Sequence, residues 1–226
     1  MTPSGRRLIP SHREIIMVRV IIVDDHAILR RGLIQIISEA ANLKMAGEAG
    51  TSTQALQLLR TTPCDVVLLD ISLPDRNGIE TLKLIRKEFP RLKVLMLSMH
   101  PEDQYALRAL KAGASGYLTK QSAPGQLLSA IEQVSAGRKY VTPGVAEALA
   151  NSIGDDNTQL AHHKLSIREY QTLCLIASGK SMKEIGQQMA ISVKTVSVYR
   201  SRILEKMHMK HNAELTRYAI QNNIVD

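Results

Sequence analysis

The most constraining feature of the sequence is a regular alternation between two hydrophobic periods over residues 18–136. Short apolar runs predict strands, and the longer segments between them have the spacing of amphipathic helices. Five strand and helix patterns joined by short connections indicate an α/β fold, with a doubly wound parallel sheet covered by helices on both faces. The predicted strands are 18–23, 43–48, 65–70, 92–98 and 116–118, and the predicted helices are 26–39, 52–61, 78–88, 102–112 and 124–136.

The pattern changes after Gly137. Residues 137–163 are mostly polar and predict a linker with one short helix near 143–152. Residues 164–226 contain no strand pattern and predict a small all-α domain. Its four helices are expected at 166–178, 181–189, 192–207 and 211–222. Residues 1–16, ahead of the segment that begins at Met17, are predicted to be a disordered extension or a misassigned start.

Charge and cysteine content narrow the class of protein. The net charge is +8, and residues 164–226 hold ten Lys and Arg against five Asp and Glu, which indicates a polyanionic partner for the last domain. No apolar run approaches the roughly 20 residues of a membrane span. The two isolated cysteines, Cys64 and Cys174, fit a reducing cytosol, so a cytoplasmic location is expected. His100 and the pair at 162–163 lack ligand partners and are predicted to be exposed.

Acidic residues follow two of the predicted strands. Asp24 and Asp25 end the first strand, and Asp70 ends the third, in the segment VVLLDISLP. Ligands of an open parallel sheet bind beyond the carboxyl ends of its strands, where these side chains should meet. Clustered carboxylates repel one another without a cation and suit Mg2+, and an aspartate can also accept a phosphoryl group. Ser98 and Lys120 end the fourth and fifth strands and offer donors to such a group.

This set of strand-end residues resembles the receiver domain of bacterial response regulators, over residues 17–136. The segment DISLPDRNG matches the Asp, Pro and Gly of that family at positions 70, 74 and 78. The resemblance implies a flavodoxin-like fold that accepts a phosphoryl group on Asp70 from a sensor histidine kinase. It implies Ser98 and Lys120 as phosphoryl contacts, and Ser98 with Tyr117 as the conformational switch. The implied Mg2+ ligands are Asp24, Asp25, Asp70 and the backbone carbonyl of Ser72.

Residues 180–203 have the outline of a helix-turn-helix. Ile185 and Met189 are expected to face inward on the first helix, and Val196 and Ile203 on the second. The second helix, 192–207, then presents small polar and basic side chains outward, which suits the major groove of DNA.

The wider pattern, including Arg168-Glu169, Gly179, Lys183-Glu184-Ile185 and Lys194-Thr195-Val196, resembles the LuxR-type DNA-binding domain. Joined to a receiver, it makes the chain similar to the NarL/FixJ family of transcriptional regulators. The resemblance implies a homodimer that binds duplex DNA, with the last helix as the dimer contact through Leu215 and Ala219. The implied DNA contacts are Lys194, Thr195, Ser197, Val198, Ser201, Arg202 and Lys206.

Other interpretations exist for each part. A lone Asp at a strand end is usually a turn residue, and a basic helix is often only a solvated face. A phosphotransfer or phosphatase-type enzyme could use Asp24, Asp25 and Asp70 on an external substrate, but the short connections leave no loop for a substrate pocket. A protein-binding adaptor is a third class, which salt-dependent binding to duplex DNA would separate from a regulator. The favoured prediction is a non-enzymatic response regulator that only assists its own phosphorylation and dephosphorylation.

Overall fold

The computed structural model describes residues 17–99, 102–147, 160–222 and 224–225, so the predicted extension at 1–16 lies outside the described residues. Its first domain holds a five-stranded sheet in the order β2-β1-β3-β4-β5, in which all neighbouring strands are parallel. This confirms the predicted fold class. The elements are β1 (Val18–Val23), α1 (Ala27–Ser38), β2 (Leu43–Ala49), α2 (Ser52–Thr61), β3 (Val66–Asp70), α3 (Gly78–Glu88), β4 (Lys93–Ser98), α4 (Glu102–Lys111), β5 (Gly116–Thr119) and α5 (Pro124–Ser135).

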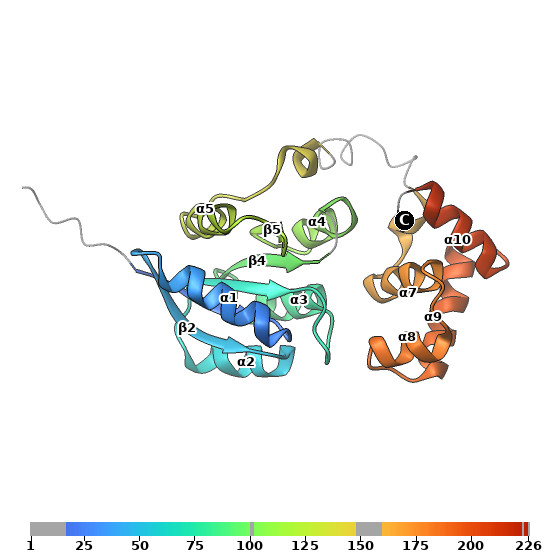
Figure 1. Ribbon diagram of the computed structural model, residues 1–226, viewed down its shortest axis with the longest axis horizontal. Helices are drawn as coiled ribbons and strands as arrows, with labels where there is room; N and C mark the ends of the chain where they lie inside the picture. The colour runs from blue at the N-terminus through green and yellow to red at the C-terminus, as the bar shows by residue number, and fades with distance from the viewer. Residues whose placement is uncertain (1–16, 100–101, 148–159, 223, 226) are drawn as a thin grey trace, which may run out of the picture.

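The strand residues divide between the two faces of the sheet because successive side chains of a strand point in opposite directions. In β3, Val66 and Leu68 pack with residues of α1 and α5, whereas Val67 and Leu69 pack with residues of α2, α3 and α4. Figure 1 shows the corresponding helix layers on either side of the sheet. All five residues of β3 are buried, including Asp70, so the acidic side chain ends a strand that has no exposed face.

The chain after α5 remains attached to the edge of the sheet. Tyr140 forms a bridge to Gly116, its amide donates to the Ser115 carbonyl over 3.0 Å, and the Lys139 ammonium donates to the Ala114 carbonyl. The first residues of the predicted linker therefore cover the outer edge of β5. A helical turn follows at 143–147, and the rest of the helix predicted near 143–152 lies outside the described residues.

The second domain is helical, as predicted, with η1 (Ala161–Lys164), α7 (Ile167–Ala177), α8 (Met182–Gln188), α9 (Val193–Lys206) and α10 (Asn212–Gln221). Serine side chains at 166, 181 and 192 accept the backbone amides that begin α7, α8 and α9. Such caps satisfy donors that the first helical turn leaves unpaired. At Gly186 a Cβ atom would lie 2.9 Å from the Ile191 carbonyl, so the tight turn from α8 into α9 favours glycine there.

Helix α4 of the first domain contacts α7 of the second. The Arg108 guanidinium donates to the backbone carbonyls of His162, over 2.7 Å, and Leu165, over 3.1 Å. It also lies 4.6 Å from the centre of the Tyr170 ring, and the buried Tyr105 meets that ring edge to face at 5.4 Å. The hydrophobic core on the α4 face of the sheet thus continues into the helical domain.

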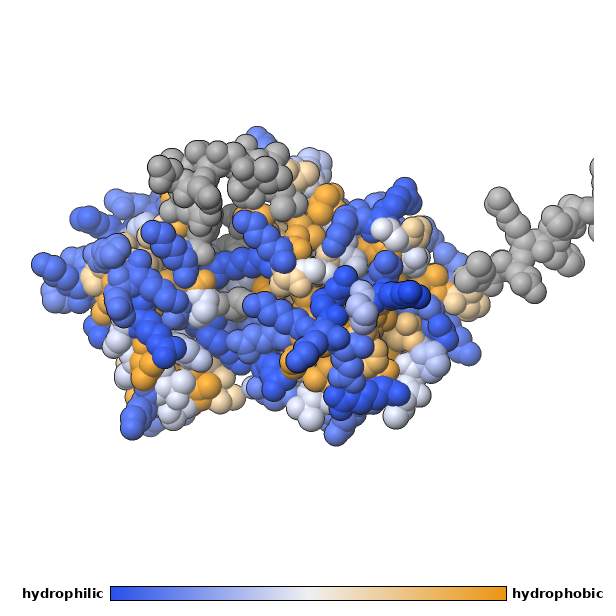
Figure 2. Space-filling model, turned by 180° about the vertical axis from the view of Figure 1, so that it is seen from behind, coloured by the Kyte–Doolittle hydropathy of each residue, from blue (hydrophilic) through white to orange (hydrophobic). Residues whose placement is uncertain are grey.

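Seen from behind, hydrophilic side chains predominate over both domains, and hydrophobic ones form small separate patches (Figure 2). Within the described ranges, no helix is long and apolar enough to span a membrane.

Candidate functional site

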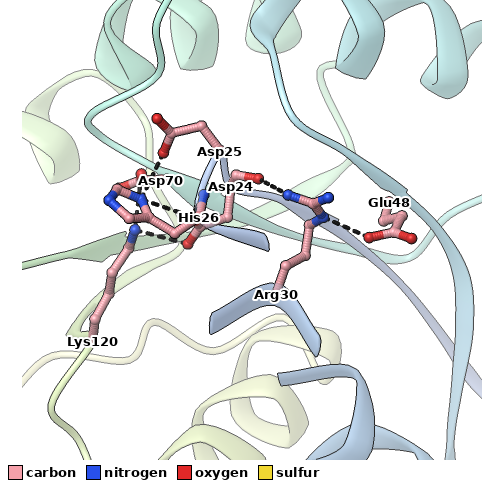
Figure 3. Close-up of polar contacts among 7 residues, drawn as sticks. All are labelled: Asp24, Asp25, His26, Arg30, Glu48, Asp70 and Lys120. Atoms are coloured by element: carbon pink, nitrogen blue, oxygen red, sulfur yellow. Dashed lines mark hydrogen bonds and ion pairs between the residues drawn. The ribbon is translucent and has the colours of Figure 1, made fainter. Parts of the chain in front are cut away.

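The predicted acidic residues meet at the carboxyl ends of β1 and β3, which are adjacent in the sheet (Figure 3). Ligand atoms of Asp24, Asp25, His26 and Asp70 all lie within 4.8 Å of one another. Asp24 and Asp70 are buried, whereas Asp25 and His26 reach the surface. The His26 ring nitrogen Nδ1 lies 2.7 Å from a carboxylate oxygen of Asp25, and its backbone amide donates to Asp24 over 2.8 Å. Connectivity alone thus brings three carboxylates together.

Lys120 places a cation between two of these carboxylates. Its Nζ lies 2.7 Å from Oδ2 of Asp24 and 2.8 Å from Oδ2 of Asp70, and all three side chains are at most 1% exposed. Burial raises the pKa of Asp70, and the like charge of Asp24 adds to this, while Lys120 and the backbone amide of Ser72 act in the opposite direction. The ion pairs with Lys120 therefore offset part of the effect of burial and favour the charged, nucleophilic form of the carboxyl group.

The residues present suit a hard divalent cation. Three carboxylates outnumber the single Lys120 ammonium, which leaves an excess of negative charge in a small volume. Both carboxylate oxygens of Asp70 are buried, and the Lys120 ammonium lies beside one of them, Oδ2. Asp25 is partly exposed, so the site also opens to water. Mg2+ prefers this combination of a few carboxylate oxygens with retained water.

The two donors predicted beside Asp70 lie on the next strands of the sheet. Ser98 ends β4 and is fully buried, and its carbonyl accepts the Lys120 amide over 2.7 Å. Tyr117, predicted as the switch residue, is 2% exposed on β5 and shares the α4-face core with Tyr105. The structure therefore brings Ser98, Lys120 and Tyr117 to the same corner of the sheet as Asp70.

The turn after β3 explains the motif that follows Asp70. The Gly78 amide donates to the Ile71 carbonyl over 2.8 Å, and the Asn77 side chain caps α3 by accepting the Ile79 amide. A Cβ atom at Gly78 would lie 2.0 Å from the Asp70 carbonyl oxygen, so any larger residue would displace the backbone of Asp70. Helix α3 is thereby packed directly under the acidic residue.

The predicted DNA-contacting residues lie on α9, and most of them face solvent. Lys194, Ser197, Val198, Ser201 and Arg202 are exposed, and Thr195 is half-buried. Val196 and Ile203, predicted to face inward, are completely buried. The exposed face thus offers cations and small polar groups together with the apolar side chains of Val193 and Val198, and the first domain does not cover it.

Some of the predicted DNA contacts, Lys206 and Thr195 among them, also have partners within the domain. The Lys206 ammonium pairs with the buried Glu169 carboxylate over 2.6 Å, and it retains 40% side-chain exposure. The hydroxyl of Thr195 lies 2.8 Å from that of Ser192, the cap of α9. Lys206 therefore stabilises the domain in addition to the phosphate contact predicted for it.

The structure contradicts the predicted dimer contact through Leu215 and Ala219. Both side chains are completely buried, because they hold α10 against the core that includes α7. Side chains with no exposed surface cannot themselves contact a second subunit. The large apolar side chain that α10 does expose is Ile220, at 52%. The role of α10 as a whole in dimerisation stays a prediction.

The sequence patterns did not identify several residues that make contacts at or near these sites. Arg30 and His26 follow the first acidic pair by only a few positions, and this proximity is the signal that could have identified them. Arg108 has no comparable signal, because its partners are backbone carbonyls of another domain. The prediction that His162 is exposed is wrong: it is 9% exposed, and its Nδ1 lies 2.9 Å from the Tyr218 hydroxyl. His100 lies outside the described residues, as does the side chain of His163.

This fold, with its strand-end residues and helix-turn-helix, defines a two-component response regulator. Residues 20–132 match the response regulator receiver domain, and residues 163–219 match the luxR family of bacterial regulatory proteins. The chain therefore belongs to the response regulators of the NarL/FixJ type, which join a receiver to a LuxR-type DNA-binding domain.

Named relatives cover almost the whole chain. It is 35% identical over 209 residues to the response regulator UvrY of Escherichia coli strain K12, covering 92% of this chain and 96% of UvrY. It is 33% identical over 211 residues to the response regulator GacA of Pseudomonas aeruginosa, covering 93% and 99%. A solved structure of RcsB from Salmonella enterica serovar Typhimurium, bound to the promoter rprA with the phosphomimetic BeF3-, has a TM-score of 0.64 and 26% identity. That match covers 89% of this chain and 98% of RcsB.

Proposed function

We propose that a sensor histidine kinase transfers a phosphoryl group to Asp70 in a Mg2+-dependent reaction, and that this promotes dimerisation and sequence-specific binding to duplex DNA. The observation that supports this most directly is the position of Lys120, within 2.8 Å of both Asp24 and Asp70 in a buried acidic cluster. A lysine held there neutralises part of the charge on a newly attached phosphoryl group. The receiver acts only on its own phosphorylation and dephosphorylation.

Asp70 acts as the nucleophile in this proposal. One of its carboxylate oxygens forms the new bond to phosphorus while the bond from phosphorus to the donor imidazole nitrogen breaks. The nitrogen keeps the electron pair of that bond and takes up a proton from solvent. Asp24, Asp25, Asp70 and the Ser72 carbonyl would hold Mg2+, which when bound neutralises phosphoryl oxygens. Lys120 and the Ser98 hydroxyl then bind the phosphoryl group as charged and neutral donors.

A protein donor has an apolar surface available beside this site. A hollow of about 260 Å3 lies between α1 and the start of α5 and includes Lys120 in its lining. Ile28, on the rim of that hollow, is 90% exposed. A donor domain that brings a phosphohistidine to Asp70 would cover this surface, which explains why a large apolar side chain lies next to a charged site.

The phosphoryl group changes the conformation of the protein through the residues around Ser98. Movement of the Ser98 hydroxyl toward the phosphoryl group alters the space available to Tyr117, which packs in the same core as Tyr105 of α4. Because α4 contacts α7 through Tyr105 and Arg108, a shift of α4 reaches the DNA-binding domain. The recognition helix α9 is already exposed. Phosphorylation therefore alters the relative position of the two domains and promotes dimerisation, and it does not act by uncovering α9.

The test combines a phosphate mimic with one substitution. Full-length protein is titrated with fluorescent duplex DNA, and its mass is measured by light scattering, each with and without beryllofluoride and Mg2+. We expect the mimic to produce a dimer and tighter DNA binding in the wild type, and to have no effect on Asp70→Asn. Persistent labelling of Asp70→Asn by a small phosphodonor would disprove the assignment of Asp70. DNA binding that does not weaken with salt would contradict the role of α9.

A further inference from the structure

Arg30 contacts the acidic site from outside, and nothing in the proposed mechanism uses it (Figure 3). It lies on the first turn of α1, and its guanidinium reaches back to the end of β1. Nη1 donates to the backbone carbonyl of Asp24 over 2.6 Å, and Nε pairs with Oε2 of Glu48 on β2 over 2.5 Å. Arg30 is 20% exposed, so most of the side chain is packed. One residue therefore ties α1, β1 and β2 together beside the carboxylates.

The carbonyl that Arg30 binds belongs to the peptide between Asp24 and Asp25. Because a peptide unit is planar, fixing its oxygen also fixes the amide of Asp25 and the position of the Asp25 Cα atom, from which the side chain extends. The other end of this turn is held by the Asp24 amide, which donates to the Ala49 carbonyl over 3.0 Å. Asp25 itself is 33% exposed, and its carboxylate pairs with the His26 ring nitrogen Nδ1 over 2.7 Å.

Glu48 limits the electrostatic effect of Arg30 on the site and helps to fix the position of its guanidinium. It is 50% exposed, and its carboxylate offsets the charge of the guanidinium that lies against the site. Glu48 is paired with Ile22 in the β1–β2 register, so its position is set by the pairing of β2 with β1. Arg30 is thereby held in one geometry, as expected of a residue that positions a metal ligand from behind.

We propose that Arg30, held by Glu48, is a positioning residue that orients Asp24 and Asp25 for Mg2+. This inference rests on the proposed function, because it assumes that the carboxylates bind the ion. Two physical effects of Arg30 on Mg2+ have opposite signs, which makes the inference testable. Through charge alone, Arg30 would repel the ion, so removing it would strengthen binding. Through positioning, removing it would weaken binding.

The experiment measures the Mg2+ dissociation constant of the full-length protein by isothermal titration calorimetry. For Arg30→Met we expect binding about tenfold weaker or more, the range found when an outer partner of a metal ligand is lost. Arg30→Lys, which keeps a cation and a donor, should recover part of this affinity. Thermal unfolding in EDTA reports the stability of each variant, so that a loss of Mg2+ affinity is not mistaken for a loss of fold.

Two controls remove the same charge without touching the site. Arg31→Met changes the exposed neighbour on α1, and Arg60→Met breaks another Arg–Glu pair, in which Nε of Arg60 lies 2.6 Å from Oε1 of Glu88. Both should bind Mg2+ as the wild type does. If Arg30→Met does not fold, Arg30→Gln, which keeps a neutral donor, is measured against the same controls.

The outcomes separate the two proposals. Unchanged or tighter Mg2+ binding in a folded Arg30 variant would overturn the positioning role while leaving the proposed function intact. Weakening of equal size in Arg31→Met or Arg60→Met would also overturn it. A wild-type protein that binds no Mg2+ would overturn the proposed function and this inference together.

Discussion

The contact between α4 and α7 depends on Arg108, and its removal gives a prediction that the structure allows us to quantify. We consider Arg108→Met, which keeps an apolar side chain of similar length but removes every donor. Arg108 donates to two backbone carbonyls of the DNA-binding domain and lies over the Tyr170 ring. Burial lowers the pKa of Arg108, although the guanidinium remains charged. The variant should therefore weaken the attachment of the two domains.

The size of the effect follows from these contacts. Hydrogen bonds from a charged group contribute about 1.5–3 kcal/mol each. The contact with an aromatic ring adds about 0.5–2 kcal/mol. The cost of withdrawing the guanidinium from water, on the order of several kcal/mol for a buried ion, offsets part of this stabilisation. We take a net loss of about 2 kcal/mol, which corresponds to about a thirtyfold increase in the separated form.

The reactivity of Cys174 reports on the equilibrium between joined and separated domains. Cys174 lies on α7 in a hollow that Tyr105 and residues 72–74 of the receiver also line. Burial raises its pKa to about 11. Separation of the domains removes the receiver from this hollow, so Cys174 should react faster with an alkylating reagent. Cys64, whose pKa burial raises to about 12, lies in the receiver near Arg19 and serves as an internal control.

The assay is site-specific alkylation followed by mass spectrometry. We expect Arg108→Met to increase the rate at Cys174 by up to about thirtyfold, because Cys174 is only half-buried in the joined form, and to leave Cys64 unchanged. Lys111→Met, which removes an exposed cation from the same helix, should leave both rates unchanged. Equal rates at Cys174 in the wild type and Arg108→Met would refute the view that Arg108 holds the domains together.

Two further predictions concern the acidic site and the helical domain. Gly78→Ala should destabilise the receiver by about 3 kcal/mol in urea unfolding, because the new Cβ would lie 2.0 Å from the Asp70 carbonyl oxygen; unchanged stability would contradict the described turn. Burial alone would raise the pKa of Glu169, but Lys206 and Ser166 outweigh it and lower this pKa. The stability that Glu169 contributes should be complete above its unfolded pKa and lost as the pH falls through the lower folded pKa. Glu169→Gln should thus be less stable by about 2 kcal/mol at pH 7 in urea unfolding, and a difference that does not shrink toward pH 3 would contradict this.

Much of the fold could be predicted from hydrophobic periodicity. The run Val66–Leu69 is apolar at every position because helices cover both faces of β3, and this pattern alone identified a central parallel strand. Asp70 then had to lie at the ligand-binding edge, since the carboxyl ends of parallel strands share one edge of the sheet. The serine caps of α7, α8 and α9 could also be predicted, because a cap satisfies donors within its own helix.

The wrong prediction for α10 has a simple cause. Leu215 and Ala219 form an apolar stripe at helical spacing, which the sequence shows clearly. An apolar stripe indicates that a helix is covered, but it does not say whether its own domain or a second subunit covers it. In the structure, contact with α7 buries the stripe completely.

By itself, the sequence determined the order of strands and helices, the edge at which the acidic residues gather and the helix that faces outward with small polar and basic groups. Each of these follows from local periodicity or from the geometry of parallel strands. Only the tertiary structure decided which charged side chains pair across the fold. Arg30 pairs with Glu48 at a separation of 18 residues and Lys206 with Glu169 at 37, while Arg108 binds the backbone carbonyl of His162 at 54. Such pairs depend on packing in three dimensions, and hydrophobic periodicity contains no information about them.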